Sequence, residues 1–394
     1  MFHNRRTILL LLAAGMFLGD RIPDARAAEP GKPGQLRVYF GTYTWKKPSK
    51  GIYMSCLDLA DGSLRPIELA AELTSPSFLT LHPSRPLLYA VGEIGSFAGK
   101  KAGAVSALAV DAKTGKLTLL NQQPSGGAGP CHVAVDRGGR NVLVANYSGG
   151  SIACLPIRAD GSLDEPSSIV QHQGSGFDPK RQQGPHAHSI GADPAGRFVL
   201  AADLGLDKLF VYRLDAAGKL TANDPPYGKV APGAGPRHFA FHPSGRFVYV
   251  INEMHSTVTA FRYDAARGAM EQLQTISTLP AGFAGPSTTA EIEIHPSGKF
   301  LYGSNRGHDS IAAFTIDQGT GRLQPGGHTS TQGRAPRNFA IDPTGAYLVA
   351  ANQDSDNVVV FRIDGASGAL RPTGQSLSVP LPVCVTFARA ESGN

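Results

Sequence analysis

The chain has 394 residues, of which 17% are charged, and it carries a formal net charge of +6. The charged fraction is too low for a disordered chain, and the positive charge is too small to indicate a nucleic-acid partner. With 47 Gly and 29 Pro, the composition suits many tight turns between short strands and predicts a globular all-β protein.

The first 27 residues differ from the rest and predict an export signal. Arg5 and Arg6 precede an apolar run over residues 8–18, and Ala25-Arg26-Ala27 offers a small-residue cleavage site. The paired arginines loosely resemble a twin-arginine signal, although they also suit an ordinary secretory signal. The apolar run is too short to cross a bilayer of roughly 30 Å, so we expect a periplasmic or secreted protein without a membrane anchor. Residues 28–35 are then a linker.

A short phrase of Gly, any residue, then Leu or Met follows strand-like apolar runs along the chain. Successive copies lie 46 to 57 residues apart, a period typical of propeller blades. We therefore predict one domain, residues 36–390, folded as an all-β seven-bladed β-propeller with four-stranded blades. The seven copies are Gly62-Ser63-Leu64, Gly115-Lys116-Leu117, Gly161-Ser162-Leu163, Gly218-Lys219-Leu220, Gly268-Ala269-Met270, Gly321-Arg322-Leu323 and Gly368-Ala369-Leu370.

A second phrase, His or Asp and usually then Pro, precedes runs rich in Val, Leu, Phe and Tyr. We interpret it as the turn between an innermost strand and the second strand of each blade. His82, His242 and His295 belong to these turns and should be structural. The predicted second strands are residues 87–91, 141–145, 198–202, 247–251, 300–304 and 347–351.

The two ends of the predicted domain each hold part of a blade. Leu36–Tyr43 has the second-strand pattern without an innermost strand before it, whereas Pro382–Phe387 resembles an innermost strand with nothing after it. We expect them to complete one blade together and close the ring, because an open ring would expose sheet edges. A closed ring leaves no free edge, so we expect a monomer.

Four cysteines in an exported protein suggest disulfides, but the blade alignment argues against them. Cys131 and Cys154 fall on the first and third strands of one blade, which are separated by about twice the ~4.8 Å strand spacing. We predict buried free thiols at Cys56, Cys131, Cys154 and Cys384.

Aligning the innermost strands on their closing His or Asp reveals unusual polar positions. A generic propeller would place small or apolar residues there, and buried charges are costly unless they pair or act. The Asn residues that end the second strands should be structural, because Asn bonds nearby backbone in turns. Four residues before the mark lie Phe78, His132, Ser189, His238, Glu291 and Asn338; one residue earlier lie Ser77, Cys131, His188, Arg237, Ala290 and Arg337; after the second strands lie Glu93, Tyr147, Leu204, Glu253, Arg306 and Gln353.

Several of these motifs resemble the lactonase family of seven-bladed propellers, which includes bacterial 6-phosphogluconolactonase and fungal carboxymuconate lactonising enzymes. The resemblance runs from about Arg37 to Phe387 and implies a cofactor-free hydrolase that opens a sugar or related carboxylated lactone. The matching motifs are Gly129-Pro130-Cys131-His132, Pro185-His186-Ala187-His188-Ser189, Gly233-Ala234-Gly235-Pro236-Arg237-His238, Ile251-Asn252-Glu253, Ala290-Glu291-Ile292, Ser304-Asn305-Arg306 and Ala335-Pro336-Arg337.

Lactone hydrolysis needs a base for water, a donor to the oxyanion and an acid for the leaving alkoxide. By residue type we assign Glu253 or His188 as the base and His132 as the proton donor or orienting group. Arg237 and Arg306 would contact the oxyanion or a substrate anion. Four further residues are expected to bind substrate, namely His186, His238, Glu291 and Arg337. For each histidine, a satisfied structural role is the alternative.

Other chemistries lack their signatures, since the chain has no Gly-x-Ser-x-Gly, His-Glu-x-x-His, Cys-x-x-Cys or phosphate loop. Glu291, Asp203 and several Asn could hold Ca²⁺, but His and Arg outnumber the carboxylates, so we expect no metal. The expected partner is a small lactone or an anionic sugar. The alternatives are a muconate-type cycloisomerase and a non-enzymatic binding platform. The insert over residues 171–184 could be a lid or a partner contact.

Overall fold

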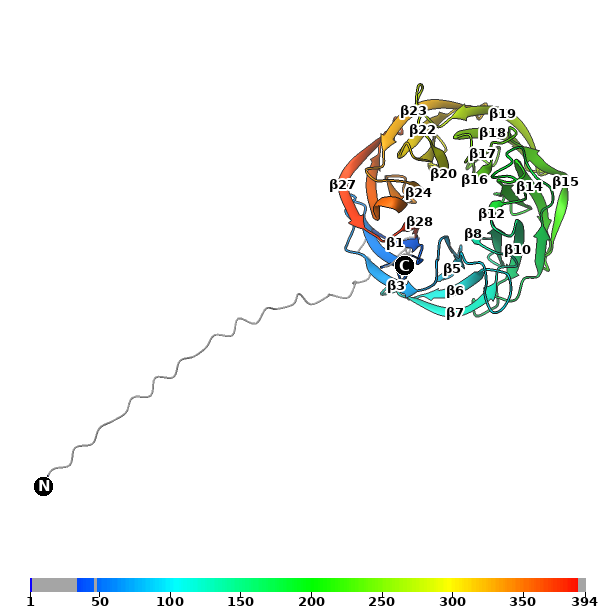
Figure 1. The fold of residues 1–394 in the computed structure, drawn as a ribbon. Helices are drawn as coiled ribbons and strands as arrows, with labels where there is room; N and C mark the ends of the chain where they lie inside the picture. The colour runs from blue at the N-terminus through cyan, green and yellow to red at the C-terminus, as the bar shows by residue number, and fades with distance from the viewer. Residues whose placement is uncertain (2–33, 46–47, 389–394) are drawn as a thin grey trace.

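The computed structural model describes Met1 and residues 34–45 and 48–388. The predicted export signal lies outside the described residues apart from Met1. The described part forms seven antiparallel sheets of four strands each, arranged as blades of a ring (Figure 1). The predicted seven-bladed propeller is therefore confirmed. In this part of the chain no helix has the length and apolar character needed to cross a membrane.

The innermost strands surround the axis of the ring (Figure 1), and each is hydrogen-bonded to a second strand. The innermost strands are β4 (Leu79–Leu81), β8 (Pro130–Val135), β12 (Ala187–Ala192), β16 (Pro236–Phe241), β20 (Thr288–Ile294), β24 (Pro336–Ile341) and β28 (Pro382–Phe387). The second strands are β1 (Gln35–Thr42), β5 (Leu87–Gly92), β9 (Asn141–Asn146), β13 (Phe198–Asp203), β17 (Phe247–Asn252), β21 (Phe300–Arg306) and β25 (Tyr347–Asn352). The predicted second strands are confirmed to within two residues.

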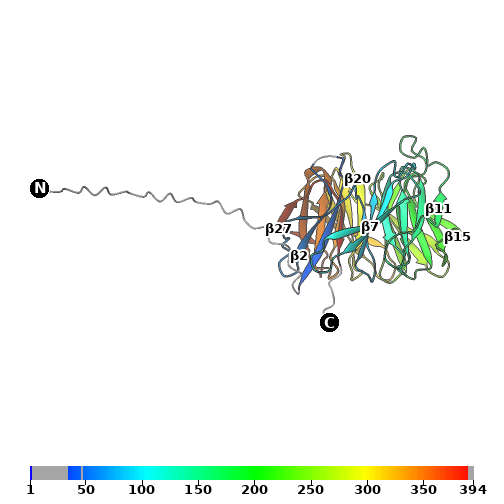
Figure 2. The same ribbon diagram turned by 90° about the horizontal axis from the view of Figure 1, so that it is seen from below.

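The third and fourth strands complete each blade toward the rim of the ring. In the side view of Figure 2, the blades lie next to one another and the loops that connect the strands form the two faces of the ring. The third strands are β2 (Gly51–Asp58), β6 (Ala104–Val110), β10 (Ser151–Pro156), β14 (Lys208–Leu214), β18 (Thr257–Asp264), β22 (Ser310–Ile316) and β26 (Asn357–Ile363). The outer strands are β3 (Glu68–Glu72), β7 (Leu117–Pro124), β11 (Ser168–Gln171), β15 (Leu220–Lys229), β19 (Ala269–Ser277), β23 (Leu323–Ser330) and β27 (Leu370–Ser378). A short 3-10 turn, η1 (Gln353–Ser355), follows β25.

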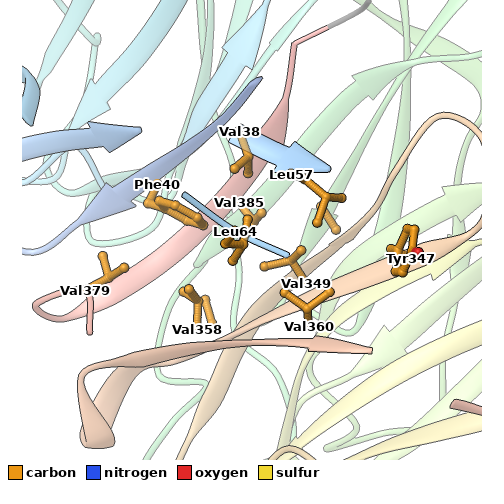
Figure 3. Close-up of a cluster of buried hydrophobic side chains, with 12 residues drawn as sticks. Val38, Phe40, Leu57, Leu64, Tyr347, Val349, Val358, Val360, Val379 and Val385 are labelled. Carbon is orange, nitrogen blue, oxygen red and sulfur yellow. The ribbon is translucent and has the colours of Figure 1, made fainter. Parts of the chain in front are cut away.

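Strands from the two ends of the domain close the ring, as predicted. One blade has the strand order β28-β1-β2-β3, and β1 pairs antiparallel with β28. An apolar cluster that includes Phe40, Val385 and Val358 joins this closing blade to the blade of β24–β27 (Figure 3). Because fully buried Val, Leu and Phe side chains each contribute about 1.5–3 kcal/mol, this contact stabilises the closed ring.

The Gly-x-Leu phrase has a structural cause at the contact between neighbouring blades. It lies in the turn between the third and outer strands, where its Gly has positive φ, for example +74° at Gly321. A Cβ there would lie 2.4 Å from the ring of Phe247 in the adjacent blade. The Tyr249 hydroxyl of that same blade donates to the Gly321 carbonyl at 2.8 Å. Only glycine satisfies both the backbone and the close approach.

The three histidines in the turns between the innermost and second strands have the structural role that the sequence predicted. The Nε2 atoms of His82, His242 and His295 each lie 2.9 Å from a carbonyl oxygen in the next blade. Their Nδ1 atoms each accept a backbone N–H two residues on, so each ring is fully engaged in its turn. All four cysteines are buried free thiols, as predicted.

Candidate active site

A β-bulge interrupts five of the innermost strands at the polar positions found by alignment. In β16 the pairing with β17 jumps from Pro236 to His238, which leaves Arg237 without a partner in the ladder. The same jump in β12 and β24 leaves out His188 and Arg337. Bulges are frequent next to active sites because they redirect a side chain. In a regular strand, alternate residues face the same side. Because the bulge inserts one extra residue, two consecutive residues of these strands, such as Arg237 and His238, can both carry polar groups of the site.

Three arginines surround the buried carboxylate of Glu253, which directly follows β17. The nearest contacts to its oxygens are 3.1 Å for Arg237 Nε, 2.9 Å for Arg306 Nη2 and 2.8 Å for Arg181 Nη2. Burial alone would raise the pKa of Glu253, but these arginines outweigh it and lower the pKa to about 2. Glu253 is therefore a fixed anion that holds the guanidinium groups in place.

Arg181 was not among the predicted site residues, and it comes from the insert between β11 and β12. Gln182 anchors the insert by donating to the Leu204 carbonyl and to Asp207, both at 2.7 Å. At the start of the insert, buried His172 Nδ1 lies 2.6 Å from Asp203. The sequence analysis identified the insert as a candidate lid or partner contact. The sequence of the insert did not indicate which of its cationic side chains would reach Glu253.

Next to the arginines, three histidine rings and one phenylalanine ring form a cluster, in which His188 and His238 are buried and His132 and Phe78 are half-buried. The His238 ring centroid lies 5.2 Å from His132, 5.3 Å from His188 and 5.6 Å from Phe78. Burial, followed by the positive charge of neighbouring side chains, holds the pKa of each histidine well below its usual value. The three imidazoles are therefore neutral at pH 7.

His238 is further bonded to Glu291 of the next blade, with 2.9 Å between Nδ1 and Oε1. Asn338 donates to the other oxygen of Glu291, and its own carbonyl oxygen accepts the Val385 N–H at 2.7 Å. Burial raises the pKa of Glu291 to about 7, against the lowering effect of Arg237. The two carboxylates of the site thus differ sharply in proton affinity.

The remaining predicted residues lie at the edges of this group. The guanidinium of Arg337 stacks 5.5 Å from the ring centroid of Tyr43, whose hydroxyl donates to Glu93 at 3.0 Å. His186 is stacked 4.6 Å from Tyr147 and bonded to the Tyr147 carbonyl, so it supports the cluster from the side. Tyr43 was missed by alignment because its blade is divided between the two ends of the domain.

Several buried polar atoms at this level have no hydrogen-bond partner within the described residues. Of eight such atoms, four belong to the polar positions found by alignment: Ser77 Oγ, Ser189 Oγ, His238 Nε2 and Arg306 Nε. Buried polar groups are normally satisfied, so these atoms mark a place for substrate or water. They include an obligate donor, Arg306 Nε, and a nitrogen of a neutral imidazole.

The proposed calcium ligands are not gathered into a metal centre. Both oxygens of Asp203 already accept hydrogen bonds, from His172 and from backbone N–H groups of His186 and Gly205. Within residues 34–45 and 48–388 no group of three or more His, Cys, Asp or Glu is arranged to hold a metal ion. The residues present instead offer arginine donors, neutral imidazoles and one carboxyl group of high pKa.

This ring of four-stranded blades, with polar bulges on its innermost strands, defines the class as a seven-bladed β-propeller. The profile described as "Lactonase, 7-bladed beta-propeller" matches residues 37–387. The chain belongs to this lactonase family, as the resemblance predicted.

Individual relatives match this chain over three quarters of its length or more. The 6-phosphogluconolactonase of Bacillus subtilis is 40% identical over 349 residues, covering 89% of this chain and 97% of that protein. The 6-phosphogluconolactonase of Formosa agariphila is 35% identical and covers 77% of this chain and 86% of that protein. The solved periplasmic gluconolactonase of Pseudomonas aeruginosa superposes with a TM-score of 0.85 at 36% identity, covering 90% of this chain and 99% of that one.

Proposed function

We propose that the arginine and histidine cluster is the active site of a lactone hydrolase that opens a sugar-derived lactone carrying an anionic group. The observation that carries the proposal is the pairing of buried, neutral imidazoles with buried guanidinium donors, among which His238 Nε2 and Arg306 Nε have no partner within the described residues. A proton acceptor and an oxyanion donor are two of the groups that lactone hydrolysis requires, and the protonated acceptor can then serve as the acid for the leaving alkoxide.

The reaction follows from these roles. Water attacks the lactone carbonyl carbon, one of its protons passes to an imidazole, and negative charge develops on the carbonyl oxygen. Arg306 and Arg237, held by Glu253, stabilise this oxyanion. The ring C–O bond then breaks, and the leaving alkoxide takes the proton from the imidazolium. Glu253, with a pKa of about 2, is better suited to holding the arginines than to the role of base that residue type suggested.

The charge of the cluster favours an anionic substrate. Four guanidinium groups, from Arg181, Arg237, Arg306 and Arg337, outnumber the three carboxyl groups of the site. Glu253 contacts three of the arginines, Glu93 accepts from Tyr43 beside Arg337, and Glu291 lies next to Arg237. The excess is two positive charges while Glu291 is protonated and one when it is ionised, which suits a phosphate or a carboxylate. The relatives named as a 6-phosphogluconolactonase and a periplasmic gluconolactonase support a gluconate-type lactone, and the predicted export signal favours action in the periplasm.

The test is hydrolysis of glucono-δ-lactone, 6-phosphogluconolactone and a muconolactone by the purified protein, measured above the uncatalysed rate. Arg237→Ala should lower kcat/KM by about 100-fold or more, since removal of one oxyanion donor costs 10²–10³ in rate. Arg246→Ala is the matched control, because Arg246 lies on the exposed turn of the same blade, where its guanidinium donates to the Gln318 carbonyl at 2.7 Å and lies over the Phe247 ring.

Each result discriminates between functions. Full activity of Arg237→Ala would show that the arginine and histidine cluster is not the active site. A carboxymuconate is assayed in parallel, and its conversion to a lactone, without hydrolysis of the sugar lactones, would favour the cycloisomerase. A folded wild-type protein that turns over none of these compounds would contradict the enzyme proposal and favour a binding platform.

A further inference from the structure

The hydrogen bonds around Glu291 determine which of its neighbours donate. Asn338 Oδ1 accepts from the Val385 backbone N–H, so the Asn338 amide group faces Glu291 with its NH₂. The Ile292 backbone N–H donates to Glu291 Oε1 at 2.9 Å. Both oxygens of Glu291 therefore already accept hydrogen bonds from fixed donors. This arrangement stabilises the ionised carboxylate once it forms.

An ionised Glu291 in turn selects the tautomer of His238. Because the carboxylate only accepts, His238 must donate from Nδ1, which lies 2.9 Å from Oε1. A neutral imidazole with its hydrogen on Nδ1 carries a lone pair on Nε2. Nε2 is the buried atom that has no partner in the described part of the chain. His238 is thus oriented with an available proton acceptor.

The neighbouring His132 has the opposite tautomer. The Ile190 backbone N–H donates to His132 Nδ1 at 3.4 Å, so the hydrogen of the neutral ring is on Nε2. The two rings lie edge to face, 5.2 Å apart at an angle of 82°. One histidine therefore presents an acceptor nitrogen and the other a donor nitrogen within the same cluster.

We propose that His238, oriented by Glu291, is the base that activates water for attack on the lactone, and that His132 supplies a hydrogen bond to the reacting oxygens. The inference deepens the proposed function and rests on it. The water oxygen forms the new bond to the carbonyl carbon while one water proton moves to His238 Nε2. After the ring C–O bond breaks, the leaving alkoxide takes this proton from His238, and His238 is neutral again. His238 is then the catalytic residue, and Glu291 is a positioning residue.

The groups that face Glu291 determine when it is ionised. They are His238 and Arg237 from β16, His132 from β8, Asn338 from β24, Glu293 from its own strand and Cys384 from β28. On the side that includes Glu293, Glu291 and Asn338 also line a cavity of about 550 Å³.

The first experiment compares Glu291→Gln with Glu293→Gln across a pH series. Glu291→Gln should lower kcat by at least about 100-fold with little change in KM, because a wrongly held or misprotonated base loses transition-state stabilisation alone. The wild-type kcat/KM should fall as the pH drops below about 7, where Glu291 becomes protonated, and this acidic limb should be absent in Glu291→Gln. Glu293→Gln removes a carboxyl from the same strand that has no contact with His238, so it should keep the activity and an acidic limb. The midpoint of that limb should move little, because Glu293 is mostly protonated below its own pKa of about 8.

Equal loss in the two variants would overturn the inference, because the effect would then not pass through His238. Full activity of Glu291→Gln would overturn it as well. Either result, with an active wild-type protein, leaves the lactone hydrolase proposal standing.

A second measurement does not depend on turnover or on the folding of a variant. Nitrogen-15 NMR of the histidine side chains in the wild-type protein reports which ring nitrogen carries hydrogen. We expect His238 to be protonated on Nδ1 and His132 on Nε2 at pH 8. Hydrogen on His238 Nε2 would overturn the inference whatever the protein hydrolyses. A wild-type protein with the expected tautomers but no lactonase activity would refute the proposed function and, with it, the role of His238 in that reaction.

Discussion

Glu253 and Glu291 are both buried glutamates, yet their environments move their proton affinities in opposite directions. Burial raises the pKa of both carboxyls, and the outcome depends on the cations in contact. Glu253 touches three guanidinium groups and keeps a pKa of about 2, whereas Glu291 touches a neutral imidazole and an amide and reaches about 7. Such a separation is typical of sites that divide acid, base and electrostatic roles among similar residues.

Glu293 provides a test of this effect on stability. Burial, with a smaller effect of the charge on Glu291, raises its pKa from 4.5 to about 8. The folded state therefore binds this proton more tightly than the unfolded state, so the contribution to stability is complete below pH 4.5 and is lost as the pH rises through 8. Glu293→Gln keeps an acceptor for the Ile341 N–H and cannot ionise.

Relative to wild type, Glu293→Gln should gain free energy of unfolding between pH 5 and pH 9, measured by urea denaturation. Glu271→Gln, which removes an exposed carboxylate 3.9 Å from Arg262, should run parallel to wild type. If the pH dependence of stability of Glu293→Gln runs parallel to that of wild type, the pKa of the Glu293 carboxyl is not raised in the folded protein.

At the level of elements, the Gly-x-Leu turns connect the repeat in the sequence to contact between blades. Gly321→Ala forces a side chain into the left-handed region and against Phe247. We expect a loss of about 2–5 kcal/mol in the free energy of unfolding, from backbone strain of ~1–2 kcal/mol and overpacking of ~1–3 kcal/mol. Guanidinium denaturation with linear extrapolation measures it.

Gly374→Ala, in the outer strand β27, is the control for backbone strain without a contact between blades. Gly374 also has positive φ, +82°, but an added Cβ would meet no heavy atom within 4 Å. Its loss should include only the backbone strain, so the difference between the two variants reports the contact between blades. Equal losses would show that the contact with Phe247 relaxes without cost.

The insert over residues 171–184 is the element that brings Arg181 to the site. Arg181→Ala should raise KM about 10-fold and change kcat little, because a charged hydrogen bond of ~1.5 kcal/mol to a substrate anion would be lost in ground and transition states alike. Lys180→Ala, at an exposed neighbouring cation, is the control in the same steady-state assay. A drop in kcat alone would instead show that Arg181 contacts the substrate only in the transition state.

For the whole molecule, ring closure makes distant parts of the chain depend on each other. Removing residues 382–394 deletes β28, exposes the edge of β1 and opens the apolar cluster around Phe40 and Val358. We expect a protein that loses its cooperative thermal transition and associates through the free edge, measured by circular dichroism and size-exclusion chromatography. Removing residues 389–394 alone should leave both readouts unchanged. A cooperative monomer without β28 would show that closure is dispensable.

Much of this architecture could be predicted because the repeat records local requirements. Each Gly-x-Leu turn needs positive φ, each second strand is a buried apolar run, and the two partial blades at the ends of the domain are complementary. The same alignment located Arg237, His238 and Glu291, because the bulge occupies an equivalent place in successive blades. These properties depend on neighbours in sequence or on the period itself.

Tertiary structure alone decided which polar groups meet and in what protonation state. Arg181 reaches Glu253 across 72 residues, and His238 reaches Glu291 across 53. No periodic pattern predicts the first contact, because an insert has no equivalent in the other blades. The proton affinities and the histidine tautomers depend on burial and on donors from adjacent blades. Residue type therefore suggested Glu253 as a base, whereas the three arginines that surround it in the folded ring favour a role in holding them.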